Sequence, residues 1–435
     1  MEFAIELPTR AGSLLLIIAL CHALAQRLRL PDSFALTGAG VLLGIVYWML
    51  EHVAPQFTAA SITSFLTPAL PPEAYLWIFL PSILFQAAME VDTKGFLADL
   101  APILVLAIGA VLAATAGVGL MAYLMSGQRL VVCLLLGAIV STTDPSTVIS
   151  LFQGSGVPDR LIRLIEGESL FNDAAAIAIS TLLIGALSLT PPSGAAGEHP
   201  LGHFLLSLAG GCALGSIVGA AFVALSGALH SAPFSAYTLS LAVPNLIYPA
   251  AEHWLHVSGV AAAVCAGLVA NRLMQSRWAA SHLTLFRHLW QNQAALAAAA
   301  VFLLASAHVP GMLDDLNALD AITLCLALAA AIASRLCILT LCLPLLSRLG
   351  ICKPLPRAHR FLIAWGGVRG PVTLTLAICI ARNAALPSGT RHFAATMATG
   401  FVLLNLVCNG LTLSRLSRRL GIGRDERTAK AGRPE

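Results

Sequence analysis

The sequence is dominated by long apolar segments that follow one another with only short polar interruptions. Windows of about 20 apolar residues, the length of a helix that crosses the hydrocarbon core of a bilayer, recur along the whole chain. They fall at 11–27, 35–51, 74–90, 101–125, 130–152, 160–187, 201–229, 236–252, 257–271, 290–308, 319–346, 361–381 and 393–414. Lipid offers no partner to a free backbone amide or carbonyl, so such segments must be helical. We therefore expect an all-α integral membrane protein with about 13 transmembrane helices.

Composition supports this fold class and excludes others. Only 11% of the 435 residues are charged and 58% are hydrophobic, whereas about a quarter of a soluble protein is charged. The net charge of +4 does not indicate nucleic-acid binding, because membrane topology places the basic residues. No basic region followed by a cleavable small-residue site opens the chain, so no removed signal peptide is expected. The ten cysteines form no CxxC pair and are expected to be small core residues.

The distribution of Lys and Arg predicts the orientation. If the N-terminus is outside, most of the 25 basic residues fall in inner loops or the C-terminal segment. Basic residues resist translocation, so the C-terminus is expected in the cytoplasm. We interpret 1–415 as one membrane domain and 416–435 as a short basic cytoplasmic tail without regular structure. The residues left in outer loops are Arg10, Arg129, Arg382 and Arg391.

Ionisable residues inside the apolar segments are few, and each costs a few kcal/mol at mid-membrane. Such groups are expected to face partners, water or a substrate. The alternative is that they pair with one another only to lock helices together. They are Asp144, Glu166, Glu168, Asp173, Glu252, Arg335 and Arg369.

Two of the segments contain a proline near the middle. Pro145 follows Asp144 in TDPST, and Pro371 follows Arg369-Gly in RGPVT. A proline removes a backbone donor and interrupts the helix, which at mid-membrane is tolerated where the break lines a cavity. Two crossed breaks bring like helix ends together, so Asp144 can offset the positive ends, and a cation such as Arg335 or Arg369 the negative ones. Alone, Asp144 could equally be a cap at a simple proline kink.

The segment 160–187 carries a carboxylate close to its centre. Ser169 and Asp173 are four residues apart and share one helix face, which suggests a cation site. Glu168 lies about 140° away from Asp173 and therefore needs a cationic partner elsewhere. Glu166 is on the Asp173 stripe but about 10 Å nearer the cytoplasm, where it could shape an inner entrance or be a hydrated helix-end charge.

At these residues the sequence resembles the monovalent cation/proton antiporter family, in the branch of NhaP-type and NHE-type sodium/proton exchangers. The resemblance covers nearly the whole chain, and the ESLFND and TDP pair on successive segments is highly specific. It implies a fold of thirteen spans in inverted repeats, with a core domain (about 101–187 and 319–414) that moves as an elevator against a dimerisation scaffold. The matching segments are FLPSILFQAAMEVD at 79–92, GAIVSTTDPSTV at 137–148, IEGESLFNDAAAIA at 165–178, VSGVAAAVCAGLV at 257–269, ASRL at 333–336 and WGGVRGPVTL at 365–374.

The resemblance also implies residue roles. Asp173 corresponds to the essential carboxylate, and its neighbour Asn172 is expected to bind the ion with it, as are Asp144 and Gln86. Ser169 and Thr143 correspond to further ligands of the metal ion. In this chain Phe85 is followed by Gln86, where the family usually has a glutamate, so one negative charge near the site is missing.

Further roles follow for the remaining buried charges. Asp144 and Arg335 correspond to the charges at the crossed breaks. Glu168 and Arg369 correspond to an ion pair that bridges the sixth and twelfth spans, in agreement with the separate helix face of Glu168.

The function implied is secondary antiport of Na⁺ or Li⁺ against H⁺, with roles in sodium transport and pH homeostasis. A single carboxylate that binds either the metal ion or the proton, but never both, is sufficient for such exchange. With asparagine at 172 rather than a second aspartate, exchange should be one to one and electroneutral. Expected partners are the monovalent cation, the proton, membrane lipids and a second copy in a homodimer. No cofactor is expected, and a bacterial inner membrane is the expected location.

Three other functions are compatible with some of these features. K⁺/H⁺ exchange by the same fold is the main alternative, because ion size selectivity depends on ligand geometry that sequence does not give. An intramembrane aspartyl protease would also place two aspartates on adjacent spans, but it would show GxGD, whereas Asp173 is preceded by LFN. A channel or sensory membrane protein is a third possibility, and the sequence offers no sensor domain for it.

Overall fold

The computed structural model describes residues 2–28, 30–53, 72–152, 157–188, 200–228, 233–314 and 316–422. Within those ranges every regular element is a helix, so the all-α expectation is confirmed. Eight of the described helices are long and apolar enough to cross a membrane, and three shorter apolar helices accompany them. The proline-rich connections near 54–71 and at 190–199 lie outside the described residues.

The first half of the chain forms helices over the expected apolar segments. It contains α1 (Glu2–Leu28), α2 (Asp32–Val53), α5 (Pro72–Glu90), α6 (Thr93–Ala98), α7 (Leu100–Leu104), η1 (Val105–Ala110), α8 (Val111–Ser126), α9 (Leu130–Ile139), α10 (Pro145–Phe152) and α11 (Asp159–Leu187). α7, η1 and α8 follow one another directly, so a π-helical turn lies inside this segment.

The second half repeats this pattern of long and interrupted helices. It contains α12 (Pro200–Ala228), α13 (Pro233–Pro249), η2 (Ala250–Trp254), α14 (Gly259–Arg277), α15 (Ala280–Ser306), α16 (Val309–Met312), α17 (Ala318–Arg348), α18 (Arg357–Trp365), α19 (Pro371–Arg382), α20 (Ser388–Asn405), η3 (Leu406–Gly410) and α21 (Leu411–Arg419). α15 begins ten residues before the expected segment 290–308, because its polar first turns can form a helix outside the apolar layer.

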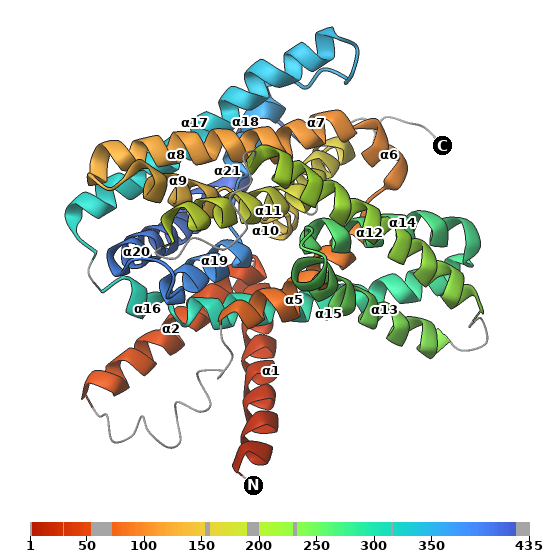
Figure 1. Cartoon of the computed structure of the whole chain (residues 1–435), viewed down its shortest axis with the longest axis horizontal. Coiled ribbons are helices and arrows are strands. Elements are labelled where there is room, and N and C mark those ends of the chain that lie inside the picture. The colour runs from red at the N-terminus through yellow and green to blue at the C-terminus, as the bar shows by residue number, and fades with distance from the viewer. Residues whose placement is uncertain are drawn as a thin grey trace.

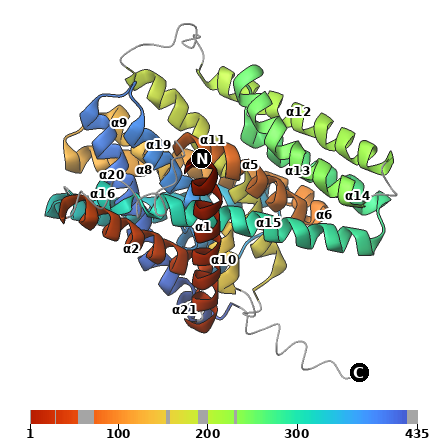
Figure 2. The ribbon, with the colours of Figure 1, turned by 90° about the horizontal axis from the view of Figure 1, so that it is seen from below.

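Two groups of helices lie on either side of α11. Figures 1 and 2 show α12, α13 and α14 on one side and α8, α9 and α20 on the other. α11 packs on α9 and η1, and also on α5 and α14 from the other group. Any group that α11 carries at its centre is therefore enclosed by both sets of helices.

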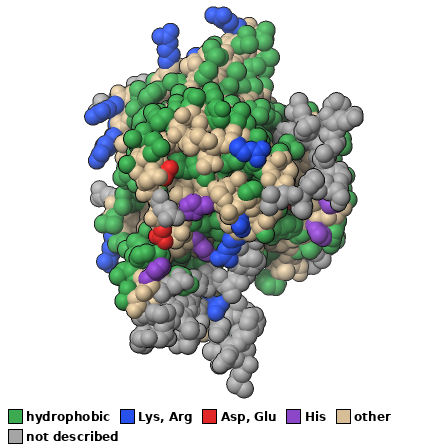
Figure 3. All heavy atoms as spheres, turned by 60° about the vertical axis from the view of Figure 1, so that its left-hand side comes forward, with side chains coloured by type: hydrophobic (Ala, Val, Ile, Leu, Met, Phe, Trp, Pro, Cys, Tyr) green, Lys and Arg blue, Asp and Glu red, His purple; other side chains and the backbone are tan. Residues whose placement is uncertain are grey.

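The outer surface is suited to lipid. Many large apolar side chains are exposed on the outer helices, among them Leu20, Leu42 and Leu124. Figure 3 shows a face on which hydrophobic side chains predominate and acidic ones are scarce. A soluble monomer rarely exposes so much contiguous apolar surface, so this surface is expected to contact the hydrocarbon layer.

Two of the expected segments are interrupted in the middle. α9 ends at Ile139 and α10 begins at Pro145, while α18 ends at Trp365 and α19 begins at Pro371. The two interruptions contact each other, because the Asp144 amide donates a hydrogen bond to the Val368 carbonyl at 2.8 Å. Each break begins its second half-helix with a proline, which needs no amide partner at that position.

The C-terminal segment differs from expectation at its start. Residues 416–435 were predicted to be a tail without regular structure, but helix α21 continues to Arg419, with Leu413 and Ser417 buried. Its apolar side packs on α10 and α18, which stabilises a helix in an otherwise basic segment. Residues 423–435 lie outside the described part of the chain.

Close packing of α12 on α14 depends on glycine. A methyl group at Gly215 would overlap the backbone of Ala262, and Gly211 and Gly219 face Ser258 and Ala266 in the same way. Membrane helices without a hydrophobic driving force associate through such close backbone contact. The glycines therefore set the distance between these two helices.

Replacing Gly215 by alanine should destabilise the protein by about 1–3 kcal/mol, the usual cost of overpacking. The matched control is Gly185→Ala in α11, because a methyl group at Gly185 would meet nothing within 4 Å. The thermal midpoint of the detergent-solubilised protein measures the effect. Equal midpoints for the two variants would contradict the packing role of Gly215.

Candidate ion-binding site

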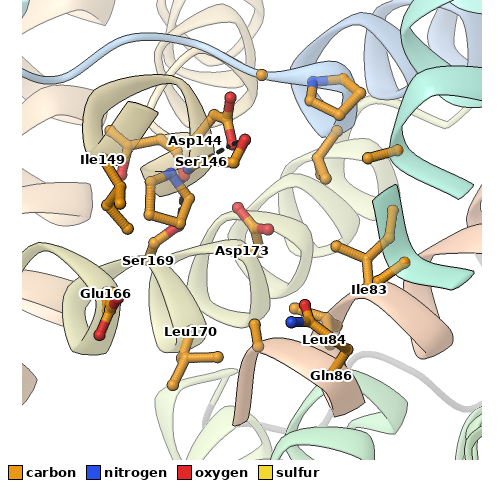
Figure 4. A pocket seen from close by; sticks show the side chains of 18 of the residues that line it. Ile83, Leu84, Gln86, Asp144, Ser146, Ile149, Glu166, Ser169, Leu170 and Asp173 are labelled. Atoms are coloured by element: carbon orange, nitrogen blue, oxygen red, sulfur yellow. Dashed lines mark hydrogen bonds between the residues drawn. The ribbon is translucent and has the colours of Figure 1, made fainter. Parts of the chain in front are cut away.

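A buried carboxylate lies at the centre of α11. The Asp173 side chain is 7% exposed, and its Oδ1 atom has no hydrogen-bond partner among the described residues. It lines a cavity of about 360 Å³, between Asp144 on one side and Gln86 on the other (Figure 4). Buried polar atoms are normally paired, so an unpaired oxygen in a carboxylate that lines a cavity indicates a place for a ligand.

Further oxygen atoms surround this carboxylate. Ser169, Thr143 and Asp144 line the same cavity as Asp173, and Gln86 lines it from α5. The structure thus brings together five of the residues expected to bind the ion, namely Gln86, Thr143, Asp144, Ser169 and Asp173. Hydroxyl, carbonyl and carboxylate oxygens are the groups that hard cations prefer.

Asn172 occupies a different position from the one predicted. It was expected to be a ligand, but it does not line the cavity. Its Nδ2 atom donates to Thr143 Oγ1 at 2.5 Å, while Ser169 Oγ donates to the Thr143 carbonyl, also at 2.5 Å. Two side chains of α11 therefore hold the extended segment between α9 and α10, which makes Asn172 a positioning residue for Thr143.

Asp144 lies at the start of α10 and close to the start of α19. Its carboxylate accepts hydrogen bonds from the Ser146 amide (3.1 Å) and hydroxyl (2.6 Å) and from the Thr147 hydroxyl (2.5 Å). A methyl group at Gly370 would come within 2.6 Å of Asp144 Cβ, so glycine is needed where the two helix starts meet. The carboxylate thus offsets the positive ends of both half-helices.

The buried ion pair differs from the one expected. Glu168 was predicted to pair with Arg369, but Arg335 Nη2 of α17 lies 2.5 Å from Glu168 Oε2, and both side chains are buried. Arg369 Nη1 instead donates to the carbonyls of Ser141 (3.1 Å) and Thr142 (2.8 Å).

The physical reason for this exchange of roles is the position of the two arginines. Arg369 is itself part of the break before α19, which contacts the break after α9, so its side chain reaches the free carbonyls there. Arg335 approaches from α17 and passes Gly367, where a methyl group would overlap its guanidinium. Arg369 therefore binds the carbonyls of the first break, while Arg335 lies beside the second break and neutralises Glu168.

Sequence reasoning missed two asparagines that complete the second break. Asn405 Oδ1 accepts from the Arg369 amide at 2.8 Å, and its Nδ2 donates to the Gly367 carbonyl at 3.1 Å. Asn409 Nδ2 donates to the Trp365 carbonyl at 2.8 Å. Two amides four residues apart in the apolar segment 393–414 were the available signal, since they share one helix face.

The pairing of Glu168 can be tested by double-mutant cycles. Removing one partner of a buried ion pair typically costs about 3–5 kcal/mol because the other charge is left unpaired. We expect a coupling energy between Glu168→Gln and Arg335→Met that is clearly larger than the one between Glu168→Gln and Arg369→Met. The free energy of unfolding in detergent measures both cycles. Stronger coupling to Arg369 would support the original prediction and contradict the observed pairing.

The chain matches known proteins along nearly its whole length. The profile of the family described as "Sodium/hydrogen exchanger, transmembrane" matches residues 13–419. The Na⁺/H⁺ antiporter ApNhaP of Aphanothece halophytica is 30% identical over 357 residues, which cover 81% of this chain and 66% of that protein. The Na⁺/H⁺ antiporter NhaH of Halobacillus dabanensis is 28% identical over 409 residues, 92% of this chain and 94% of NhaH.

Some relatives are much longer than the matched region. The match to sodium/hydrogen exchanger 7 of Arabidopsis thaliana, 27% identical, covers 94% of this chain but only 36% of that protein. Among solved structures, the sodium proton antiporter MjNhaP1 of Methanocaldococcus jannaschii at pH 8 has the same fold, with a TM-score of 0.73 at 19% identity and coverage of 97% of this chain and 99% of that one. Fold, apolar surface and profile agree, and this multi-pass membrane protein belongs to the family of transmembrane sodium/hydrogen exchangers.

Proposed function

We propose that the chain is a Na⁺/H⁺ antiporter in which Asp173 binds a proton and a Na⁺ ion in turn. The observation that carries the proposal is the buried Asp173 carboxylate at the centre of α11, which lines a cavity and whose Oδ1 atom has no hydrogen-bond partner among the described residues. A carboxylate in this position can be neutralised by a proton or by a metal ion, but not by both together. Competition between the two ions on one group is the chemical basis of exchange.

In the proposed site the cation is held by Asp173, Ser169 and Thr143, with water completing its shell. The Ser169 hydroxyl donates its hydrogen bond to the Thr143 carbonyl, so its oxygen lone pairs remain available to a cation in the cavity. Asn172 fixes the Thr143 hydroxyl, and Asp144 is held by the start of α10. With Thr143 and Asp144 held by these contacts, Asp173 is the one titrating carboxylate for the transported ions in the proposed site.

The transport cycle we propose is an elevator. The core, about 101–187 and 319–414, carries both breaks and moves against a dimerising scaffold made of the other spans. Thirteen spans in inverted repeats, an outer N-terminus and a cytoplasmic C-terminus belong to the same proposal. It is supported by the two interrupted helices and by the enclosure of α11 between two groups of helices. K⁺ is the competing cargo, because Gln86 stands on the wall facing Asp173 (Figure 4) where the family usually has a glutamate.

The central test is Asp173→Asn in proteoliposomes. We expect the variant to lose Na⁺-driven proton movement to the background of empty vesicles, because an amide can be neither protonated nor neutralised by Na⁺. Fluorescence of a trapped pH dye after addition of Na⁺, Li⁺ or K⁺ gives the measurement. Asp159→Asn, an exposed aspartate on the same helix, is the control and should transport normally. Full activity of Asp173→Asn would refute the site.

A second test concerns charge. One titrating carboxylate predicts exchange of one Na⁺ for one H⁺, so transport should build no membrane potential. A voltage-sensitive dye in vesicles with a Na⁺ gradient should remain silent while the pH dye responds, and the potassium ionophore valinomycin should not change the rate. A potential generated by the protein itself would show that a second charge moves in each cycle.

A further inference from the structure

A pair of buried hydroxyls joins α2 to α10. Ser33 Oγ lies 3.0 Å from Thr147 Oγ1, within the range of a hydrogen bond between two hydroxyls. The side chains are only 5% and 2% exposed. α2 packs mainly on α1, α15 and α16, whereas α10 packs mainly on α11 and α21. The two hydroxyls therefore connect helices that have different principal neighbours.

Thr147 extends this contact to the first break. Its hydroxyl also hydrogen-bonds to the Asp144 carboxylate at 2.5 Å, and its amide donates to the same carboxylate at 3.3 Å. Asp144 lines the cavity of Asp173. A chain of three side chains thus leads from α2 to the wall of the proposed ion site.

The helix that carries Thr147 borders two cavities. Ser146 and Ser150 of α10 line the cavity of Asp173, and they also line a second cavity of about 500 Å³. This second cavity is bounded by α1, α2, α10 and α15, and both Ser33 and Thr147 belong to its wall. A helix bordered by open space on two sides has few packing contacts there to fix its position. A single hydrogen bond to α2 can therefore have a large effect on where α10 lies.

Other polar contacts between the proposed core and scaffold lie beside the chain connections between them. Arg160 binds Asp99, which comes just before the core begins. The Thr396 hydroxyl donates to the carbonyl of Met312, which comes just before α17. Neither hydroxyl of the α2–α10 contact lies near such a connection in the sequence. A displacement of the core past α2 would have to break this contact.

We infer that Ser33 is a positioning residue, which holds Thr147 and the start of α10 in the conformation described here and is released when the core moves. The inference rests on the proposed function, because it requires a core that moves against the scaffold. The cavity of Asp173 reaches Glu166 near the start of α11, on the side that the proposed orientation assigns to the cytoplasm. The contact therefore stabilises the inward-facing conformation relative to the outward-facing one.

The test is Ser33→Ala, which removes the hydroxyl and leaves Asp173, Ser169 and Thr143 unchanged. The net contribution of one hydrogen bond corresponds to a population ratio of about two- to tenfold, so the ratio of outward-facing to inward-facing molecules should rise by this factor. The apparent affinity from each side scales with the fraction of molecules that face that side. The half-saturating Na⁺ concentration on the cytoplasmic side, divided by that on the outer side, should therefore rise by the same factor. Everted and right-side-out membrane vesicles give the two values.

Two further variants separate this role from a general structural one. Ser33→Thr keeps the hydroxyl and should restore the wild-type ratio. Ser226→Ala is the matched control, because Ser226 is a buried scaffold serine whose hydroxyl donates to the Val223 carbonyl of its own helix. It should leave the ratio unchanged. A partly misfolded variant would lower the maximal rate in both kinds of vesicle without changing the ratio.

Hydrogen–deuterium exchange of the purified protein gives a measurement that does not depend on transport. Amides of α10 should exchange about two- to tenfold faster in Ser33→Ala than in the wild type, because the helix has lost its contact with α2. Amides of α12, which is remote from the contact in the sequence, should exchange at the wild-type rate.

Three outcomes would overturn the inference. They are an unchanged ratio of half-saturating concentrations in Ser33→Ala, an equal change in Ser226→Ala, and faster hydrogen exchange throughout the chain rather than in α10. Each leaves the proposed function intact as long as the wild type exchanges Na⁺ for H⁺ and Asp173→Asn does not. A wild type that exchanges no cation would overturn the proposed function instead, so the two failures are distinguishable.

Discussion

The structure depends on satisfying backbone groups where two helices are broken in the middle of a membrane protein. Lipid supplies no hydrogen bonds, so every freed amide and carbonyl there needs a partner from the protein. The Asp144 amide donates a hydrogen bond to the Val368 carbonyl, and Arg369 donates to the carbonyls of Ser141 and Thr142. The Asn405 side chain accepts a hydrogen bond from the Arg369 amide and donates one to the Gly367 carbonyl. These contacts hold the two breaks together, and the cavity forms beside them.

The placement of the buried charged side chains follows from the same constraint. Helix starts carry partial positive charge and helix ends partial negative charge, so a pair of breaks needs both an anion and a cation. Asp144 is bound at the start of α10 by the Ser146 and Thr147 hydroxyls, and Arg369 binds the Ser141 and Thr142 carbonyls at the end of α9. Glu168 is neutralised by Arg335. Among the described residues, Asp173 is left as the buried carboxylate of α11 without a cationic partner, which is the condition that exchange on one group requires.

Small residues then determine how closely the charged groups lie against the second break. Gly370 and Gly367 allow Asp144 and Arg335 to lie against the second break, where any side chain would collide. The two buried acids of α11 differ in their surroundings: Glu168 pairs with Arg335, whereas Asp173 lines the cavity and has no ion pair among the described residues.

The sequence by itself determined the membrane fold class, the positions of the apolar segments, the two proline breaks and the helix face shared by Ser169 and Asp173. These features follow from local patterns: segment length, proline chemistry and helical periodicity. Only the tertiary structure decided which arginine meets Glu168, that Asn172 holds Thr143 rather than facing the cavity, and that Asn405 and Asn409 complete the second break. Such choices depend on how α11, α17 and α20 lie against the breaks, and neither periodicity nor composition specifies the relative placement of distant helices.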